Sequence, residues 1–92
     1  MKYEIKITTR FKRDYKIALK RGCSREALKN VVQNLADGVP LDPRYKDHTL
    51  SGRWANYREC HISPDWLLIY RVDDDVLILT LVRTGSHSDL FK

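Results

Sequence analysis

Two short runs in the last third of the chain constrain its fold most strongly. Residues 66–70 and 76–82 are apolar almost throughout, so both faces of the strands that they would form are apolar. We therefore expect both runs to be central strands of a sheet. The residues Asp73, Asp74 and Asp75 separate the two runs and predict a turn between them.

The N-terminal part of the chain predicts a strand followed by two helices. Residues 2–8 alternate between polar and apolar side chains, which is typical of a half-buried strand. Apolar residues then recur at helical spacing between Phe11 and Leu19, and again between Leu28 and Leu35. We expect Thr8 or Thr9 to cap the first helix and Gly22 to end it. Ser24 is expected to cap the second helix, and Gly38 to end it.

The remaining residues complete a small α+β domain. Residues 38–52 hold two prolines and two glycines without a clean period, which predicts an ordered loop. Strands are expected over residues 53–62, 66–72 and 76–83. The predicted order is β-α-α-β-β-β in a single domain, residues 1–92. It combines an N-terminal strand with an antiparallel helical hairpin packed on an antiparallel β-sheet.

Positive charge is concentrated at the start of the chain. Residues 1–38 carry ten Lys/Arg and four Asp/Glu, whereas residues 39–92 carry seven Lys/Arg and eight Asp/Glu. A basic block of this kind favours a polyanion or an acidic protein as partner, although a solvated helix face has the same composition.

Composition also indicates the compartment. No apolar run approaches the roughly 18 residues that a membrane span needs. The N-terminus lacks the apolar stretch of a signal peptide. The two cysteines, Cys23 and Cys60, cannot form a dense disulfide framework and are expected to be reduced thiols. We therefore expect a cytoplasmic protein without a membrane partner.

The register of the last hairpin predicts a cluster of polar side chains. If residues 73–75 form a three-residue loop, Asp65 lies opposite Arg83 on the same face of the sheet. The preceding turn, at Ser63-Pro64, brings His61 to that end of the sheet, and His87 follows Arg83 closely in sequence. This prediction depends on the loop length, because a slip of one residue reverses the faces.

Three interpretations fit this cluster. Asp65 and Arg83 could form an ordinary surface ion pair. Three histidines and an aspartate could bind zinc, but the sequence has no HxH or HExxH spacing, so no metal or other cofactor is expected. Histidines with an Asp and an Arg also suit acid–base cleavage of RNA, in which the 2′-hydroxyl is the nucleophile and a cation stabilises the phosphorane.

Three ordered motifs carry a resemblance to a known family. They are residues 41–54 (LDPRYKDHTLSGRW), 57–66 (YRECHISPDW) and 83–91 (RTGSHSDLF). With these motifs the chain resembles YafQ-type toxins of the RelE/ParE superfamily, and the resemblance covers essentially the whole chain. It implies a bacterial type II toxin that cuts mRNA in the ribosomal A site and that is neutralised by a cognate antitoxin. Acid–base attack of the 2′-hydroxyl predicts that this cut leaves a 2′,3′-cyclic phosphate and a 5′-hydroxyl.

The resemblance also implies roles for individual residues. The positions that match the family's active site are His48, His61, Asp65, Arg83 and His87. Among them His87 is the candidate general acid, His48 helped by Asp65 the candidate base, and Arg83 the phosphate ligand, while His61 either reacts or orients its neighbours.

Further residues are candidates for binding RNA or the ribosome. Candidate RNA contacts are Tyr45, Lys46, Trp66 and Phe91, although the aromatic residues fit packing roles equally well. Candidate ribosomal RNA contacts on the first helix are Lys12, Arg13, Lys16 and Lys20. The competing hypothesis is a non-catalytic, ParE-like inhibitor that binds gyrase or another partner through the same fold.

Overall fold

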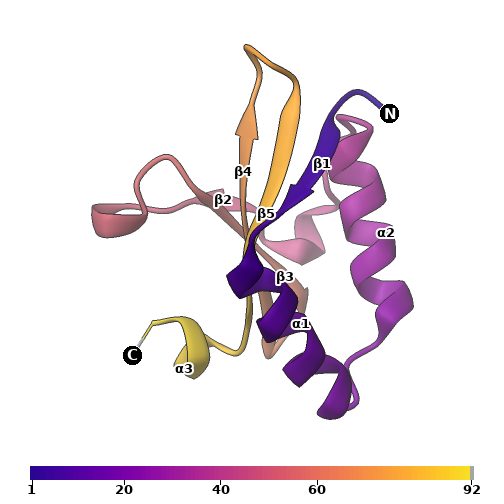
Figure 1. Ribbon diagram of the computed structural model, residues 1–92, viewed down its shortest axis with the longest axis vertical. Coiled ribbons are helices and arrows are strands. Elements are labelled where there is room, and N and C mark those ends of the chain that lie inside the picture. The colour runs from indigo at the N-terminus through magenta and orange to yellow at the C-terminus, as the bar shows by residue number, and fades with distance from the viewer. Residues whose placement is uncertain (92) are drawn as a thin grey trace.

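The structure is a computed structural model that describes residues 1–91. Its helices and strands, in chain order, are β1 (Glu4–Ile7), α1 (Thr9–Lys20), α2 (Arg25–Ala36), β2 (His48–Thr49), β3 (Arg58–Ser63), β4 (Trp66–Asp73), β5 (Ile78–Gly85) and α3 (His87–Leu90). Two single 3₁₀ turns, Pro43–Tyr45 and Gly52–Trp54, flank β2. The strands form one sheet in the order β1-β5-β4-β3-β2 (Figure 1), which confirms the predicted α+β class.

The two apolar runs are confirmed as inner strands of the sheet. β4 pairs with β3 on one side and β5 on the other, and β5 also pairs with β1. Leu68, Ile69 and Leu79 are completely buried, as expected for strands covered on both faces.

The sheet differs from the prediction in three respects. β1 pairs with β5 in parallel, so the sheet is mixed. The strand predicted over residues 53–62 begins only at Arg58, because Gly52–Trp54 forms a 3₁₀ turn. The short strand β2 and the one-turn helix α3 were not predicted, since two to four residues are too few for a periodic signal.

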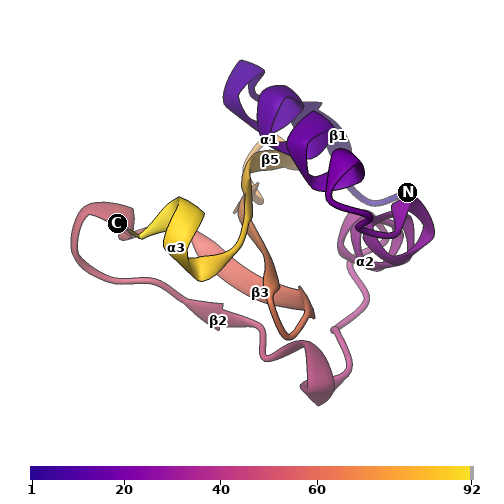
Figure 2. The same ribbon diagram turned by 90° about the horizontal axis from the view of Figure 1, so that it is seen from below.

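The helix boundaries are those that the sequence predicts. The Thr8 side chain caps α1 by accepting from the Phe11 N–H, and Ser24 caps α2 by accepting from the Ala27 N–H. α1 and α2 run in roughly opposite directions (Figure 1). In the turned view, α2 and α3 lie on opposite sides of the sheet, and α1 lies along its β1–β5 edge (Figure 2). None of the helices within residues 1–91 is long and apolar enough to cross a membrane.

Each face of the sheet has its own apolar cluster. The larger cluster packs α1 and α2 against strand residues such as Leu68, Tyr70 and Leu79. The smaller cluster joins Leu67 and Ile69 of β4 to Leu90 of α3. Both cysteines are free, and burial raises the pKa of the Cys60 thiol to about 12.

The predicted register of the last hairpin is wrong. Arg83 lies opposite Ile69 and not opposite Asp65, because two features shift the pairing. The β4–β5 turn contains four unpaired residues, 74–77, and a bulge then displaces the pairing between Ile69 and Tyr70. The bulge could not be seen in a pattern that is apolar on both faces, because such a pattern fits either register.

A hydrogen-bonded triad fixes the loop that leads into β2. The Asp47 carboxylate accepts hydrogen bonds from Arg58 at 3.2 and 3.3 Å and another from the Tyr70 hydroxyl. Tyr70 is only 1% exposed, and burial together with the Asp47 bond raises its pKa. Since His48 follows Asp47 directly, the triad also fixes where His48 enters the sheet.

The triad predicts a stability difference between two hydroxyl deletions. Tyr70→Phe should lower the free energy of unfolding by about 1.5–3 kcal/mol, because Asp47 loses a partly buried hydrogen bond to a charged group. Tyr57→Phe is the matched control, since the Tyr57 hydroxyl makes no hydrogen bond within residues 1–91. Urea denaturation followed by circular dichroism measures both changes, and equal losses in the two variants would contradict the anchoring role.

Candidate active site

Strand pairing brings two of the predicted histidines together on one face of the sheet. His48 of β2 lies opposite Glu59 of β3, and His61 lies two residues further along β3 on the same face. The two imidazole rings are 6.5 Å apart between centroids. We call the face formed by His48, Glu59 and His61 the histidine face.

Glu59 is the centre of the histidine face. One of its oxygens, Oε1, lies 3.4 Å from Nε2 of His48 and 3.7 Å from Nε2 of His61. The residue is 5% exposed, and its other oxygen, Oε2, is buried without a hydrogen-bond partner within residues 1–91. Both imidazoles thus share one carboxylate oxygen.

The contacts of His48 determine which nitrogen can exchange a proton. Nδ1 lies 2.7 Å from the carbonyl oxygen of Lys46, and a carbonyl can only accept, so Nδ1 carries a hydrogen. Nε2 is therefore the atom that can act as a base, and it faces Glu59. The carboxylate beside His48 is thus Glu59 and not Asp65, which was the expected helper.

Helix α3 places His87 and Phe91 next to this face. Leu90 packs with Leu67 and Ile69, whose cross-strand neighbours are His61 and Glu59. The His87 ring is exposed and lies 5.0 Å from the Phe91 ring. Phe91 is partly exposed and also contacts Trp54 edge to face. A histidine that is open to solvent and has an aromatic neighbour is placed to reach a substrate bound from outside.

Arg83 is held by an acidic residue that the sequence analysis did not single out. Its Nε and Nη2 donate to the two oxygens of Asp14 at 2.9 and 3.0 Å, and Asp14 also accepts from the Thr84 N–H. The pKa of Arg83 is raised, chiefly by this hydrogen bonding. Nη1 has no partner within residues 1–91, so the guanidinium keeps donors for an anion while its orientation is fixed.

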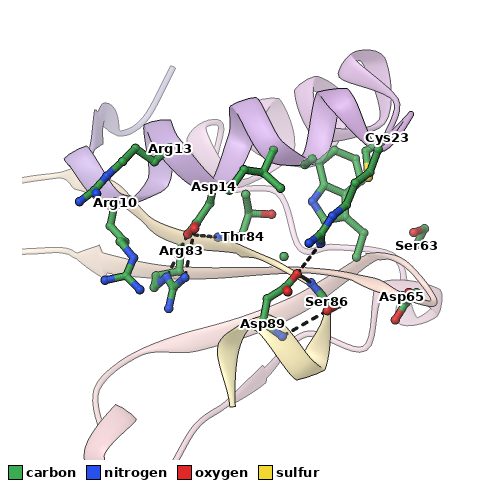
Figure 3. Close-up of a pocket in the computed structure, with 15 residues that line it drawn as sticks. Arg10, Arg13, Asp14, Cys23, Ser63, Asp65, Arg83, Thr84, Ser86 and Asp89 are labelled. Carbon is green, nitrogen blue, oxygen red and sulfur yellow. Dashed lines mark hydrogen bonds and ion pairs between the residues drawn. The ribbon is translucent and has the colours of Figure 1, made fainter. Parts of the chain in front are cut away.

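Asp65 and Trp66 lie away from the histidine face. Both line a pocket of about 600 Å³ between α1 and the ends of β4 and β5, together with Arg83 (Figure 3). Asp65 is exposed in the β3–β4 turn and makes no ion pair within residues 1–91. Trp66 is 3% exposed and belongs to the larger core, so it offers no free face to a nucleobase.

The other predicted contacts occupy the surface. Tyr45 is half-buried against the larger core, with the Arg44 guanidinium 4.9 Å above its ring, and Lys46 is exposed beside it. The four cations predicted on the first helix are all exposed on α1: Lys12, Arg13, Lys16 and Lys20. His48, Glu59 and His61 are donor types for metals, but the described residues contain no group of three or more that could hold an ion.

The structure adds three acidic residues that sequence reasoning missed. Glu59 stands two positions before His61, so the period of a strand could have placed both on one face. Asp14 and Asp89 gave no such signal, because their partners Arg83 and Arg21 are 69 and 68 residues away in sequence.

Asp89 connects α3 to the end of α1. Its carboxylate accepts from Arg21 at 2.6 Å and from the Ser86 N–H at 2.9 Å, and the Ser86 hydroxyl accepts from the Asp89 N–H. A methyl group at Gly85 would lie 3.0 Å from the Asp89 side chain, so glycine permits this close approach. The Arg21 bond, followed by the Ser86 bond, holds the pKa of Asp89 well below its usual value. A single helical turn is unstable alone, so this contact fixes the turn that carries His87.

The contact predicts a pH-dependent difference in hydrogen exchange. Asp89→Asn should speed exchange of the α3 amides at pH 7, because the charge that attracts Arg21 is lost. Since folding lowers the pKa of Asp89, its contribution is present at neutral pH. It fades as the pH falls below about 3.9, the value for an unfolded Asp, towards the folded pKa. The two proteins should therefore converge in acid. Asp75→Asn removes an equal charge elsewhere and should match wild type throughout; unchanged exchange in Asp89→Asn at pH 7 would refute the connection.

Comparison with known proteins identifies relatives over the whole chain. A family model described as "Bacterial toxin of type II toxin-antitoxin system, YafQ" matches residues 3–92. The mRNA interferase toxin YafQ of Escherichia coli strain K12 is 39% identical over 89 residues, which are 96% of this chain and 95% of that protein.

Solved structures share the fold at similar identity. YafQ from E. coli strain BL21(DE3) superposes with a TM-score of 0.91 at 37% identity, covering 98% of this chain and 99% of that one. The toxin in an E. coli DinJ–YafQ complex superposes with a TM-score of 0.89 at 38% identity, with the same coverage. A metal-bound toxin from Helicobacter pylori superposes with a TM-score of 0.91 at 46% identity, covering 97% of this chain and 99% of that one. The chain therefore belongs to the YafQ family of toxins from bacterial type II toxin–antitoxin systems.

Proposed function

We propose that this protein is an endoribonuclease toxin that cuts mRNA and thereby inhibits translation. The observation that carries the proposal is the buried Glu59 carboxylate shared by His48 and His61, on the face next to His87. The relative from E. coli K12 is named an mRNA interferase, which supports the same activity here.

The residues supply the parts of a metal-independent cleavage. Nε2 of His48 takes the proton from the 2′-hydroxyl, and Glu59 stabilises the positive charge that the imidazole gains. The 2′-oxygen attacks the adjacent phosphorus, and the bond to the 5′-oxygen breaks. His87 gives a proton to that leaving oxygen, so the products are a 2′,3′-cyclic phosphate and a 5′-hydroxyl.

Other residues would hold the substrate. The free Nη1 of Arg83 binds a phosphate oxygen, with Asp14 fixing the orientation of the guanidinium. Phe91 stacks on a base beside His87, and Tyr45 and Lys46 contact RNA near His48. His61 shares Glu59 and either reacts or orients His48. Asp65 stays a proposed site residue in the adjoining turn, and Trp66 positions that turn from the core.

We propose the ribosome and an antitoxin as partners in the bacterial cytoplasm. A chain of 92 residues offers little surface to orient a message alone, so the ribosomal A site would align it. The exposed cations of α1 would then contact ribosomal RNA: Lys12, Arg13, Lys16 and Lys20. The DinJ–YafQ complex of E. coli supports a cognate antitoxin here, with an acidic segment that neutralises the basic surface.

Cleavage of a defined mRNA on programmed ribosomes tests the function. Wild-type toxin treated with EDTA should cut the message and leave the two ends described above, and His87→Ala should lose cutting while remaining folded. The mechanism would be refuted if cutting required added divalent metal or left a 5′-phosphate end. The metal-bound toxin from H. pylori is the reason for testing the metal. Folded wild type that cuts no message would instead favour a binding toxin, with gyrase as the next target.

Glu59 provides a second test that a purely structural residue would not pass. Glu59→Gln keeps the size of the side chain but removes the charge that stabilises the His48 imidazolium. We expect kcat to fall by about 10²-fold, the range for loss of assisted proton transfer, with little change in KM. Glu4→Gln is the control, because Glu4 is exposed and its one ion pair within residues 1–91 is with Lys6. Equal activity in wild type and Glu59→Gln would remove Glu59 from the mechanism.

A further inference from the structure

The pocket beside α1 contains more positive charge than its own acidic residues neutralise. Four arginines line it: Arg10 and Arg13 from α1, Arg21 directly after α1, and Arg83 from β5. The first three lie on one side of the helix, because separations of three and eleven residues are close to whole turns. Asp14 and Asp89 each pair with one arginine, namely Arg83 and Arg21.

Two of these arginines have no acidic partner in the described part of the chain. Arg10 and Arg13 are exposed, and neither belongs to any ion pair within residues 1–91. Figure 3 shows them with Arg83 at the end of the pocket that lies away from Asp65. We call the group Arg10, Arg13 and Arg83 the arginine end.

Asp14 cannot neutralise this group. Its two oxygens already accept from Arg83 Nε, Arg83 Nη2 and the Thr84 N–H. Its charge offsets Arg83, so Arg10 and Arg13 have no ion-pair partner within residues 1–91, and the remaining aspartate, Asp65, lies at the other end of the pocket. The arginine end therefore combines two free guanidinium groups with a third whose orientation is fixed and whose Nη1 is unpaired. Planar forked donors of this kind match the oxygens of a phosphodiester.

We propose that Arg10 and Arg13 of the arginine end bind a phosphate of single-stranded RNA next to the phosphate that is cleaved, which Arg83 holds. This assigns Arg13 to the substrate RNA rather than to ribosomal RNA. The inference deepens the proposed function and rests on it. Pairing across the sheet sets His48 opposite Glu59, Glu59 opposite Ile69, and Ile69 opposite Arg83. A strand of RNA that reaches His48 at one end of this row meets Arg83 at the other, and its backbone continues towards Arg10 and Arg13.

An acidic protein segment is the rival occupant, because guanidinium groups also bind carboxylates. The position favours RNA, since Arg83 connects the arginine end to the row that carries the proposed reaction. An RNA strand also presents a phosphate at every nucleotide, so a second phosphate is available wherever the first is bound.

The test measures how RNA binding depends on salt. The probe is a fluorescent oligonucleotide with 2′-O-methyl groups throughout, which lacks the nucleophile and stays intact. Fluorescence anisotropy gives the affinity of the full chain over a range of salt concentrations. Each phosphate contact to a single strand contributes about 0.7 to the slope of log affinity against log salt. Arg10→Gln with Arg13→Gln removes the contact to one phosphate and should therefore lower the slope by about 0.7, and Arg10→Gln alone should lower it by less.

A matched control removes the same charge elsewhere. Arg25→Gln with Lys29→Gln changes two exposed residues of α2 that do not line the pocket, so the wild-type slope should remain. Circular dichroism checks that every variant is folded. Three outcomes would each overturn the proposal. The Arg10/Arg13 variant could have the same slope as wild type, it could lose no more slope than the control variant, or wild type could fail to bind the oligonucleotide even at low salt. If the Arg10/Arg13 variant keeps the wild-type slope for RNA but binds the purified antitoxin more weakly, the arginine end belongs to the protein partner.

Failure of this proposal can be told apart from failure of the proposed function. Wild type that binds the oligonucleotide with the expected loss of slope in the variants, but cuts no message on ribosomes, would leave the arginine end and refute the nuclease. If wild type cuts the message normally but the Arg10/Arg13 variant keeps the wild-type salt slope, the nuclease stands and the role of the arginine end is refuted.

Discussion

The Asp14 carboxylate joins the helical layer to the edge of the sheet that carries Arg83. β1 covers that edge only as far as Ile7, after which the Thr8 N–H donates to Leu81 and the chain turns into α1. Beyond this point the edge of β5 would face solvent. Asp14 instead accepts a hydrogen bond from the Thr84 N–H and holds the Arg83 guanidinium. One side chain therefore provides the acceptor that this edge N–H needs and also fixes the orientation of the arginine. The pocket and the orientation of its arginines depend on this contact.

The two faces of the sheet separate stability from chemistry. The face towards α1 and α2 is packed with large apolar residues and contains most of the core. The opposite face has a smaller apolar cluster, and its remaining positions hold His48, Glu59 and His61. Because neighbouring residues of a strand point to opposite faces, β3 contributes Cys60 and Ile62 to the core while Glu59 and His61 stay on the other side. A small domain can thus combine a dry core with a polar site on the same strands.

The sequence predicted the parts of this arrangement that local signals determine. Helix caps at Thr8 and Ser24 and the inner strands β4 and β5 are confirmed, because capping and apolar runs are properties of adjacent residues. The pairing of Asp65 with Arg83 was wrong, because a bulge and a four-residue turn leave no pattern in a strand that is apolar on both faces. The sequence predicted His48 and His61 as site residues but not the Glu59 between them, although the two-residue period of a strand places Glu59 on the same face as His61. Contacts such as Arg83 with Asp14 join residues at opposite ends of the chain, and only the folded structure brings them together.

Glu59 is hard to explain as a contribution to stability alone. It is 5% exposed, its Oε2 has no partner within residues 1–91, and its cross-strand neighbour Ile69 is apolar. An unsatisfied buried acceptor costs about 1–3 kcal/mol, so an apolar side chain at this position would serve the fold better. The contacts of its carboxylate within residues 1–91 are those of Oε1 with the two imidazoles. A buried polar side chain that is unfavourable for folding and that faces two histidines is what a functional site would keep, and this placement supports the proposed role of Glu59.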